Sequence, residues 1–239
     1  MLVSPNARRF LIGLLAAVCV GYQTLVLAQE TYAKWCWRLP IILSGYSAEG
    51  SLTNFPLLAI LGEHLEGFRY SRFSSPTGND LRFSDSSGTQ ALPFEIEKWD
   101  TNGLSYVWVK VPVVQGTQTM VYAYGGNPEA TSLPPDRPWD DDAVAVWHMN
   151  ETNALDSSGK GLHGTALPGI AVTTGMIGNA IETATTNHLV VASNSVFALG
   201  TNYSVSAWIR SSPVANWEGI VGTYQDPGGF ILALDNTIS

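Results

Sequence analysis

Glu95 and Glu97 are the two carboxylates whose spacing could support acid–base chemistry. Alternate residues of a β-strand share one face, which would place the two Cβ atoms about 7 Å apart. Carboxyl groups about 5–5.5 Å apart can carry out retaining glycoside hydrolysis. The alternative, which we favour, is that both acids belong to the solvent-facing side of an amphipathic strand. We therefore assign no catalytic residue and expect no enzymatic activity, and we keep hydrolysis by this pair as an alternative.

Asp156 and Asn150 are the candidate metal ligands, because the segment around them is rich in Asp, Asn, Ser and Gly. Calcium takes about six to eight oxygen ligands, many of them from such loops. The spacing does not match an EF-hand, and an Asx turn in which Asp156 accepts backbone N–H groups is the alternative. Asp140–Asp142 is a second acidic run, which a solvated charge cluster explains more simply. A structural Ca²⁺ is the only cofactor that we consider, since the histidines lack the spacing of a zinc site or a catalytic triad.

The aromatic residues suggest a second kind of site, because the C–H faces of sugars stack on aromatic rings. Trp217 and Tyr224 flank one loop of the second half of the chain, and Trp99 lies beside a turn. These three are the predicted ligand-binding residues, and Trp139 is a further exposed candidate. Tryptophan in β-sandwiches is more often part of the core. We assign the other strand tryptophans to the core or to packing between sheets: Trp108, Trp147 and Trp208.

The elements that must position these residues are β-strands. Alternating apolar and polar residues, rich in β-branched and aromatic types, are separated by turn clusters of Asp, Ser, Asn and Gly. The predicted strands cover residues 35–43, 55–61, 81–84, 92–99, 105–111, 119–124, 143–148, 188–192, 203–210, 219–224 and 230–234. Only residues 62–68 look briefly helical. The fold class is all-β, with two β-sandwich (jelly-roll-like) domains, the second incomplete, after an N-terminal signal helix.

The first 28 residues have the features of a signal peptide. Arg8 and Arg9 precede the apolar run Phe10–Val20, and the small residue Ala28 marks the expected cleavage point. An uncleaved anchor and lipidation at Cys19 are the alternatives. Four consecutive parts follow from these boundaries: a signal peptide (1–28), a β-sandwich domain (29–131), a Pro/Asp-rich linker (132–142) and a partial jelly roll (143–239). Because the last predicted strand lies close to Ser239, we expect the second domain to be a fragment or to be completed by other polypeptide.

Composition limits the function further. The chain is 45% hydrophobic and only 13% charged, with a formal net charge of -8. An acidic chain without a basic cluster is a poor binder of nucleic acid and of anionic membranes, so we expect no nucleic-acid partner and no membrane contact beyond the signal segment. Cys36, the one cysteine outside the signal peptide, cannot form an internal disulfide and is predicted to be a small buried hydrophobic residue. The expected location is secreted, extracellular or at the cell surface.

The first half of the chain resembles a bacterial family of domains of unknown function. The blocks WCWRLPIIL, LTNFPLLAIL, GNDLRFSDSSGTQALPFEIEKWD, SYVWVKVP and VYAYGGNPEA occur in the order typical of that family, over about residues 33–130. The family is associated with laminin-G-like surface proteins and with proteins labelled as biopolymer transport components. The resemblance implies a β-sandwich of secreted or surface proteins without an established activity.

The second half, residues 143–239, resembles the laminin-G-like, concanavalin A-like lectin/glucanase superfamily. DSSGKGLHG, GMIGNAI and YSVSAWIR carry the resemblance, but Glu182-Thr183-Ala184 replaces a Phe-Asp-Gly turn that members often carry. The resemblance implies binding of glycans or proteins, often with a structural calcium. We expect a non-catalytic module that binds carbohydrate or surface proteins. A structural or adhesive segment of a larger surface protein is the alternative, and the glycoside hydrolase described above is the third hypothesis.

Overall fold

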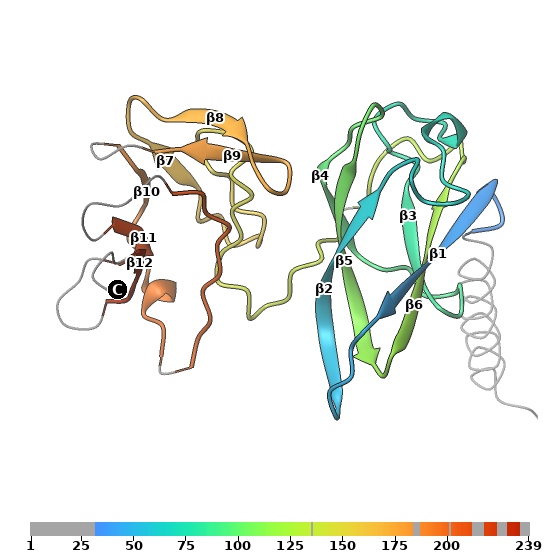
Figure 1. The fold of residues 1–239 in the computed structure, drawn as a ribbon, viewed down its shortest axis with the longest axis horizontal. Coiled ribbons are helices and arrows are strands. Elements are labelled where there is room, and N and C mark those ends of the chain that lie inside the picture. Colours follow the sequence, from blue (N-terminus) through green and yellow to red (C-terminus); the bar gives the residue numbers. More distant parts are fainter. Residues whose placement is uncertain are drawn as a thin grey trace, which may run out of the picture. The chain divides into compact units, whose positions relative to one another are not determined.

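The computed structural model describes residues 32–134, 136–183, 187–200, 202–211, 218–223 and 229–234. Contacts divide the chain into two compact units, Met1–Asp140 and Asp141–Ser239. The described residues form β-strands and two 3-10 turns, so the all-β fold class is confirmed (Figure 1). Among them no helix has the length and the apolar character needed to cross a membrane. The predicted signal peptide, residues 1–28, lies outside the described residues.

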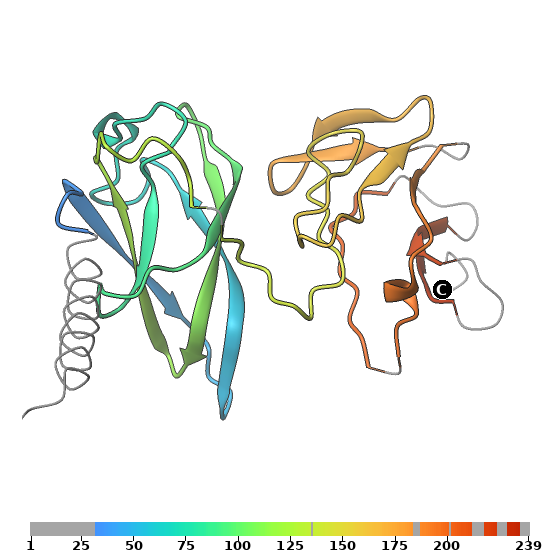
Figure 2. The same cartoon turned by 180° about the vertical axis from the view of Figure 1, so that it is seen from behind.

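The first unit is a β-sandwich of two antiparallel three-stranded sheets, visible as two layers in Figures 1 and 2. One sheet has the order β1-β6-β3, with β1 (Trp37–Ser44), β6 (Gln118–Gly125) and β3 (Arg82–Asp85). The other has the order β2-β5-β4, with β2 (Ser51–Leu61), β5 (Ser105–Gln115) and β4 (Phe94–Lys98). All six strands overlap ranges expected from the sequence pattern, which confirms the sandwich here. Residues 62–68 form successive turns rather than a helix.

The core between the two layers follows from the alternation within the strands. Val107, Val109 and Val111 of β5 are at most 2% exposed, so the residues between them point to the outer face. The opposite layer contributes the inward side chains of β6, including Val121. The largest fully buried side chains are Phe68, Phe83, Leu61 and Leu81. Burial of each such side chain stabilises the fold by about 1.5–3 kcal/mol.

The chain just before β1 packs on the outside of the β1-β6-β3 sheet. The Tyr32 ring stacks on Tyr124 with centroids 4.2 Å apart, and its hydroxyl donates to the Phe83 carbonyl at 2.9 Å. Trp35 Nε1 donates to the Asp80 carbonyl at 2.8 Å. Burial raises the pKa of Tyr32 to about 12. Cys36, which follows this segment, is exposed, so its predicted burial is wrong: its neighbours Trp35 and Trp37 are the residues that turn toward the domain.

The second unit contains three two-stranded antiparallel sheets within its described residues. They pair β7 (Gly164–Ala166) with β10 (Leu189–Val191), β8 (Ala171–Thr174) with β9 (Asn179–Glu182), and β11 (Glu218–Gly222) with β12 (Ile231–Leu234). The sequence pattern predicted β10, β11 and β12, whereas β7, β8 and β9 were not anticipated. Several small sheets are consistent with a β-sandwich.

Two predicted strands of the second unit are wrong. Residues 143–148 form only an isolated bridge, between Trp147 and Asp156. Residues 203–210 form no strand with any described part of the chain, and Trp208, which we assigned to the core, is 73% exposed. Alternating apolar and polar residues show that a segment could form a strand. A strand also needs a neighbouring strand to hydrogen-bond with, and the alternation gives no information about that partner.

Candidate functional site

The outer face of the β2-β5-β4 sheet carries a group of aromatic and acidic side chains. Leu58 of β2 and Glu95 of β4 are both directly opposite Trp108 of β5. Residues directly opposite in an antiparallel sheet project from the same side. Because Val107 and Val109 fill the core side of β5, this row of three side chains lies on the outer side.

Trp139, from the Pro/Asp-rich segment at the end of the first unit, completes the site. Its ring lies 5.3 Å from the Trp108 ring, centroid to centroid, at an interplanar angle of 53°. Trp108 Nε1 donates to Glu97 Oε2 at 2.5 Å, and Trp139 Nε1 donates to Glu95 Oε2 at 2.8 Å. All four side chains are partly exposed. We call Glu95, Glu97, Trp108 and Trp139 the tryptophan–glutamate face.

A register shift in β4 sets where the next charged residue lies. The pairing with β5 shifts between Ile96 and Lys98, which places Lys98 opposite Tyr106. Such irregularities re-aim side chains along a strand. Lys98 Nζ lies 3.1 Å from Asp100 Oδ2. The hydrogen bond from Lys98 holds the pKa of Asp100 below its ordinary value. The cation that follows Glu97 in sequence is thus engaged with Asp100.

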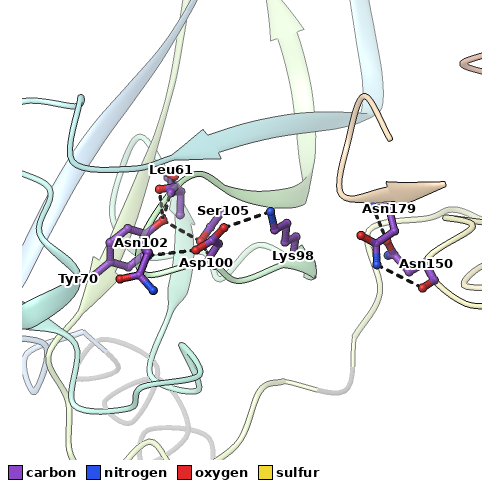
Figure 3. A network of polar contacts seen from close by, with 9 residues as sticks. Leu61, Tyr70, Lys98, Asp100, Asn102, Ser105, Asn150 and Asn179 are labelled. Carbon is purple, nitrogen blue, oxygen red and sulfur yellow. Dashed lines mark hydrogen bonds and ion pairs between the residues drawn. The ribbon is translucent and has the colours of Figure 1, made fainter. Parts of the chain in front are cut away.

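A polar network fixes the adjoining end of β5 (Figure 3). Tyr70 Oη lies 2.8 Å from Ser105 Oγ and donates to the Leu61 carbonyl at 3.1 Å. Ser105 Oγ in turn accepts the Asp100 amide at 2.9 Å, which ties the turn after β4 to the start of β5. Burial raises the pKa of Tyr70 above its ordinary value. The strands beneath the tryptophan–glutamate face are therefore held firmly at this end.

The two carboxylates of the tryptophan–glutamate face are each held by one indole N–H. Retaining hydrolysis needs one carboxyl group that keeps a proton and a second that stays ionised, which requires two different environments. Glu95 and Glu97 each accept an indole N–H on the same partly exposed face, and these contacts assign neither carboxyl a catalytic role. Fixed rings and fixed acceptors can hold a ligand without a chemical step.

Trp99, predicted as a ligand-binding residue, lies against the core. Its ring makes edge-to-face contacts with Tyr70 and Phe73, at centroid distances of 5.4 and 4.8 Å. Its Nε1 donates to the Pro76 carbonyl at 3.1 Å. This packing gives Trp99 a structural role and does not favour a binding platform. The other two predicted ligand-binding residues, Trp217 and Tyr224, lie outside the described residues, so they stay predictions.

Asp156, the first of the two predicted calcium ligands, is 4% exposed and organises its own loop. Its Oδ1 accepts the amides of Val146 and Ser158, at 3.0 and 2.9 Å. Its Oδ2 accepts the Ser158 hydroxyl and the Leu162 amide, at 2.8 and 3.0 Å. Burial raises the pKa of this carboxyl, but the backbone hydrogen bonds from Val146, Leu162 and Ser158 outweigh burial and leave the pKa below its ordinary value.

Asn150, the second predicted calcium ligand, pairs with a neighbouring hairpin instead. Its Oδ1 accepts the amide of Asn179 at 2.9 Å, as Figure 3 shows. Calcium would have to displace protein donors at Asp156, whose two oxygens accept four hydrogen bonds, and calcium binding at Asp156 and Asn150 stays a prediction. In the part of the chain that the structure describes, no group of three or more His, Cys, Asp and Glu side chains is placed to hold a metal.

Asp80, Arg82 and Asp85 form a further polar group, and each of them holds a loop. Asp80 is completely buried and accepts backbone amides of Ser74, Ser75 and Gly126. Arg82 donates to the Asn79 carbonyl at 2.8 Å. Asp85 accepts the Ser87 hydroxyl and the amides of Thr89 and Gln90, which closes the turn after β3. These contacts give all three residues a structural role.

Trp108 lies on the outer face of β5, whereas the sequence pattern predicted it in the core or in packing between sheets. The sequence does indicate this orientation, because Trp108 alternates with Val107 and Val109 along β5. It therefore shares a face with Tyr106 and Lys110. Residues that alternate with a valine series on a sandwich strand point away from the core. Trp139 was noticed as an exposed candidate, but its pairing with Trp108 depends on tertiary structure.

Comparison with known protein families gives a match over part of the chain. Residues 77–157 match the family described as Domain of unknown function (DUF2341). No curated protein and no solved structure matches the chain. The match confirms the expected domain of unknown function over part of its predicted range, and it extends beyond Asp140, where the first unit ends. It includes all four residues of the tryptophan–glutamate face. The laminin-G-like second half stays a prediction.

Proposed function

We propose that this chain is a non-catalytic binding module of an exported surface protein and that it holds carbohydrate at the tryptophan–glutamate face. The supporting observation is the pair of partly exposed indole rings, 5.3 Å apart, whose N–H groups are each fixed to a carboxylate. The family match to a domain of unknown function and the all-β fold are compatible with a binding role.

The geometry favours sugars because the face has both kinds of protein group that contact a sugar, namely aromatic rings and carboxylates. The apolar faces of a pyranose stack on indole rings, and its hydroxyl groups donate to carboxylates. The hydrogen bonds to Glu95 and Glu97 fix the ring orientations before a ligand arrives. Such preorganisation reduces the entropy lost on binding. Ile60, opposite Tyr106 and 43% exposed, extends the apolar surface on the same side of the sheet.

A structural or adhesive role in a larger surface protein is the second candidate. The observation that favours it lies in the second unit, where residues 203–209 carry exposed apolar side chains. Tyr203, Trp208 and Ile209 are 49%, 73% and 48% exposed. Clustered exposed apolar residues are typical of protein–protein contacts. In this role the second unit would contact protein, while the first unit binds carbohydrate or acts as a spacer.

The experiment is binding of the purified full chain to a panel of insoluble and soluble polysaccharides that includes cellulose, xylan, chitin and mixed-linkage β-glucan. Trp108→Ala should weaken binding at least about tenfold, which corresponds to about 1.4 kcal/mol. Trp208→Ala is the matched control, because it removes an exposed indole from the other unit. Thermal unfolding of both variants separates loss of binding from loss of fold.

Two outcomes would count against the proposal. If the wild-type chain is retained by none of the polymers, or if Trp108→Ala binds as the wild type does, the tryptophan–glutamate face is not a carbohydrate site. The same samples are assayed for reducing ends. Release of reducing ends that Glu95→Gln abolishes would favour the hydrolase alternative.

A further inference from the structure

We infer that Asn102 is a site of spontaneous covalent modification, at which its side-chain amide is lost and the turn between β4 and β5 acquires an aspartate or an isoaspartate. Asn102-Gly103 is the one Asn-Gly pair in the sequence, and both residues are exposed. The inference is independent of the proposed function, because the reaction needs only water and these two residues.

The reaction is an attack of the Gly103 backbone nitrogen on the side-chain carbonyl carbon of Asn102. The nitrogen loses its proton and forms a new bond to that carbon, while the bond from the carbon to Nδ2 breaks and ammonia leaves. Water then opens the five-membered imide at either of its two carbonyl carbons. One opening gives aspartate, and the other gives isoaspartate, in which the main chain runs through the side-chain carbon. Glycine favours ring closure because it has no Cβ and the widest conformational freedom.

The turn itself requires the labile pair. The amide of Asn102 donates to Asp100 Oδ1 at 3.0 Å, and the amide of Gly103 donates to the Asp100 carbonyl at 3.2 Å. A Cβ at position 103 would lie 3.0 Å from Asp100 Oδ2 and 3.3 Å from its Cγ, so a larger residue would push this carboxylate away from the turn that it holds. Figure 3 shows the contact between Asn102 and Asp100.

The same contacts slow the reaction in the folded protein. Gly103 must give up its amide proton before it attacks, and the Asp100 carbonyl holds that proton. Asp100 is itself fixed, because its amide donates to Ser105 Oγ at 2.9 Å and its carboxylate lies 3.1 Å from Lys98 Nζ. The turn therefore has to open before the nitrogen reacts, and the rate of modification reports how often it opens.

Modification weakens the polar network at the start of β5. The Gly103 carbonyl accepts a hydrogen bond of 3.3 Å from Tyr70 Oη, which also contacts Ser105 Oγ and the Leu61 carbonyl. Isoaspartate lengthens the main chain by one methylene group just before Gly103, so it displaces one acceptor of Tyr70. Both products also bring a second carboxylate close to that of Asp100, and the two like charges repel.

The experiment follows the purified full chain during incubation in warm, mildly alkaline buffer. Trypsin releases the peptide from Trp99 to Lys110, in which Asn102 is the one amide side chain. Mass spectrometry measures the exchange of ammonia for water in this peptide, and electron-transfer fragmentation distinguishes aspartate from isoaspartate. Asn54, which is exposed in the same unit and followed by Phe55, is the internal control. Parallel samples in urea measure the reaction in the opened turn.

Two variants separate the chemistry from its effect on the fold. Asn102→Gln has one more methylene group in its side chain, so the ring would have six members and closes much more slowly, while Gly103 and Asp100 stay in place. Freshly prepared Asn102→Asp carries the new charge without the lengthened main chain. Unfolding temperatures of both variants and of the wild type are measured before and after incubation.

We expect modification of the peptide that contains Asn102, with isoaspartate as the main product, no change at Asn54, and a reaction at least about tenfold faster in urea. The unfolding temperature of the wild type should fall during incubation, whereas that of Asn102→Gln should stay constant. Fresh Asn102→Asp should unfold between the fresh and the fully modified wild type.

Three results would overturn parts of this inference. An unchanged peptide, or modification of Asn54 to the same extent, would mean that Asn102 is not a specific site. Equal rates with and without urea would show that the contacts to Asp100 do not restrain the reaction. A constant unfolding temperature in a fully modified wild type would show that the turn does not support the network around Tyr70.

Discussion

The amide of Gly126 donates a hydrogen bond of 2.7 Å to the carboxylate of Asp80, which lies 46 residues earlier in the chain. The same carboxylate accepts the amides of Ser74 and Ser75, at 2.9 and 3.0 Å. Asp80 is 0% exposed. One buried side chain thus joins the loop before β3 to the end of β6. Its carboxylate accepts hydrogen bonds from three backbone amides.

Asp80→Ala should destabilise the first unit by about 3 kcal/mol, because it leaves buried backbone amides without their acceptor. Asp80→Asn keeps one side-chain oxygen and should cost about half as much. Urea unfolding followed by circular dichroism measures both values. Asp136→Ala, at an exposed position, is the control and should change little. A loss below about 1 kcal/mol in Asp80→Ala would show that the carboxylate is dispensable.

Gly126→Ala should destabilise the domain by about 2–4 kcal/mol. Gly126 has a φ of +85°, and a Cβ there would lie 3.0 Å from Cys36 Cβ and 3.1 Å from the Arg72 carbonyl oxygen. Gly116 is the matched comparison, since it has a φ of +65° but no atom within 4 Å of the same added carbon. Gly116→Ala should cost about 1 kcal/mol, from the backbone conformation alone. Equal melting temperatures for the two variants would contradict the crowding argument.

Tyr32 should make the stability depend on alkaline pH. Burial, with a smaller contribution from Tyr124, raises the pKa of Tyr32 from 10.0 to about 12. The folded protein therefore holds the phenol proton more tightly than the unfolded chain does, so the contribution to stability is complete below pH 10 and is lost as the pH rises toward 12. Tyr32→Phe removes this dependence and the hydrogen bond to Phe83, at a cost of about 1 kcal/mol at neutral pH.

The measurement for Tyr32 is the difference in unfolding free energy between wild type and Tyr32→Phe at several pH values from neutral to strongly alkaline. The difference should shrink as the pH passes through this window. Absorbance titration of tyrosinate should show one fewer late-titrating phenol in the variant. Since the pKa of Tyr70 is also raised, Tyr70→Phe serves as the comparison. A wild-type titration curve that Tyr32→Phe leaves unchanged would mean that Tyr32 is solvated.

Asp156 should make the second unit sensitive to acid. Its pKa lies below the ordinary value of 3.8, because hydrogen bonds from Val146, Leu162 and Ser158 outweigh the effect of burial. The resulting stability is present above that ordinary value and is lost as the pH falls through the lower, folded-state pKa. Hydrogen exchange of the three donor amides reports this loop directly. In Asp156→Asn these amides should exchange faster at neutral pH and should respond less to acid; protection equal to that of the wild type would refute the argument.

Calcium should leave the Asp156 loop unchanged. Four protein donors already approach the two carboxylate oxygens. We therefore expect the same amide exchange and the same unfolding temperature in about 1 mM calcium as in a chelator, a concentration at which extracellular calcium modules are occupied. Magnesium is the control for ionic effects. A rise in unfolding temperature with calcium that Asp156→Ala abolishes would support the predicted calcium site.

The sequence predicted the first unit well because its strands satisfy two independent conditions. In β5, valines alternate with larger or polar residues, and a cluster of turn residues lies just before the strand. The alternation and the turn signal therefore predict the same strand. Residues 203–210 satisfy only the first condition and form no described strand. β8 and β9 satisfy neither, since their short segments are held together by pairing across a turn around Gly178.

The site was harder to predict than the fold. Glu95 and Glu97 were found as a pair by their spacing, and Trp139 by its position beside turn residues. The contacts that make them a site cross between β4, β5 and the segment after β6, and one sequence holds no record of such tertiary neighbours. Trp99 shows a mixed outcome: this turn-adjacent ring is partly exposed, and it also packs against Tyr70 and Phe73.

The connection between β5 and β6 bears on how the sandwich forms. These strands are the middle members of different sheets, and only Gly116 and Thr117 separate them. Closing so short a connection costs little chain entropy, so the centres of both layers can come together before either layer acquires its edge strands. Neither layer can then melt while the other persists, and the domain should lose its structure in a single transition rather than sheet by sheet.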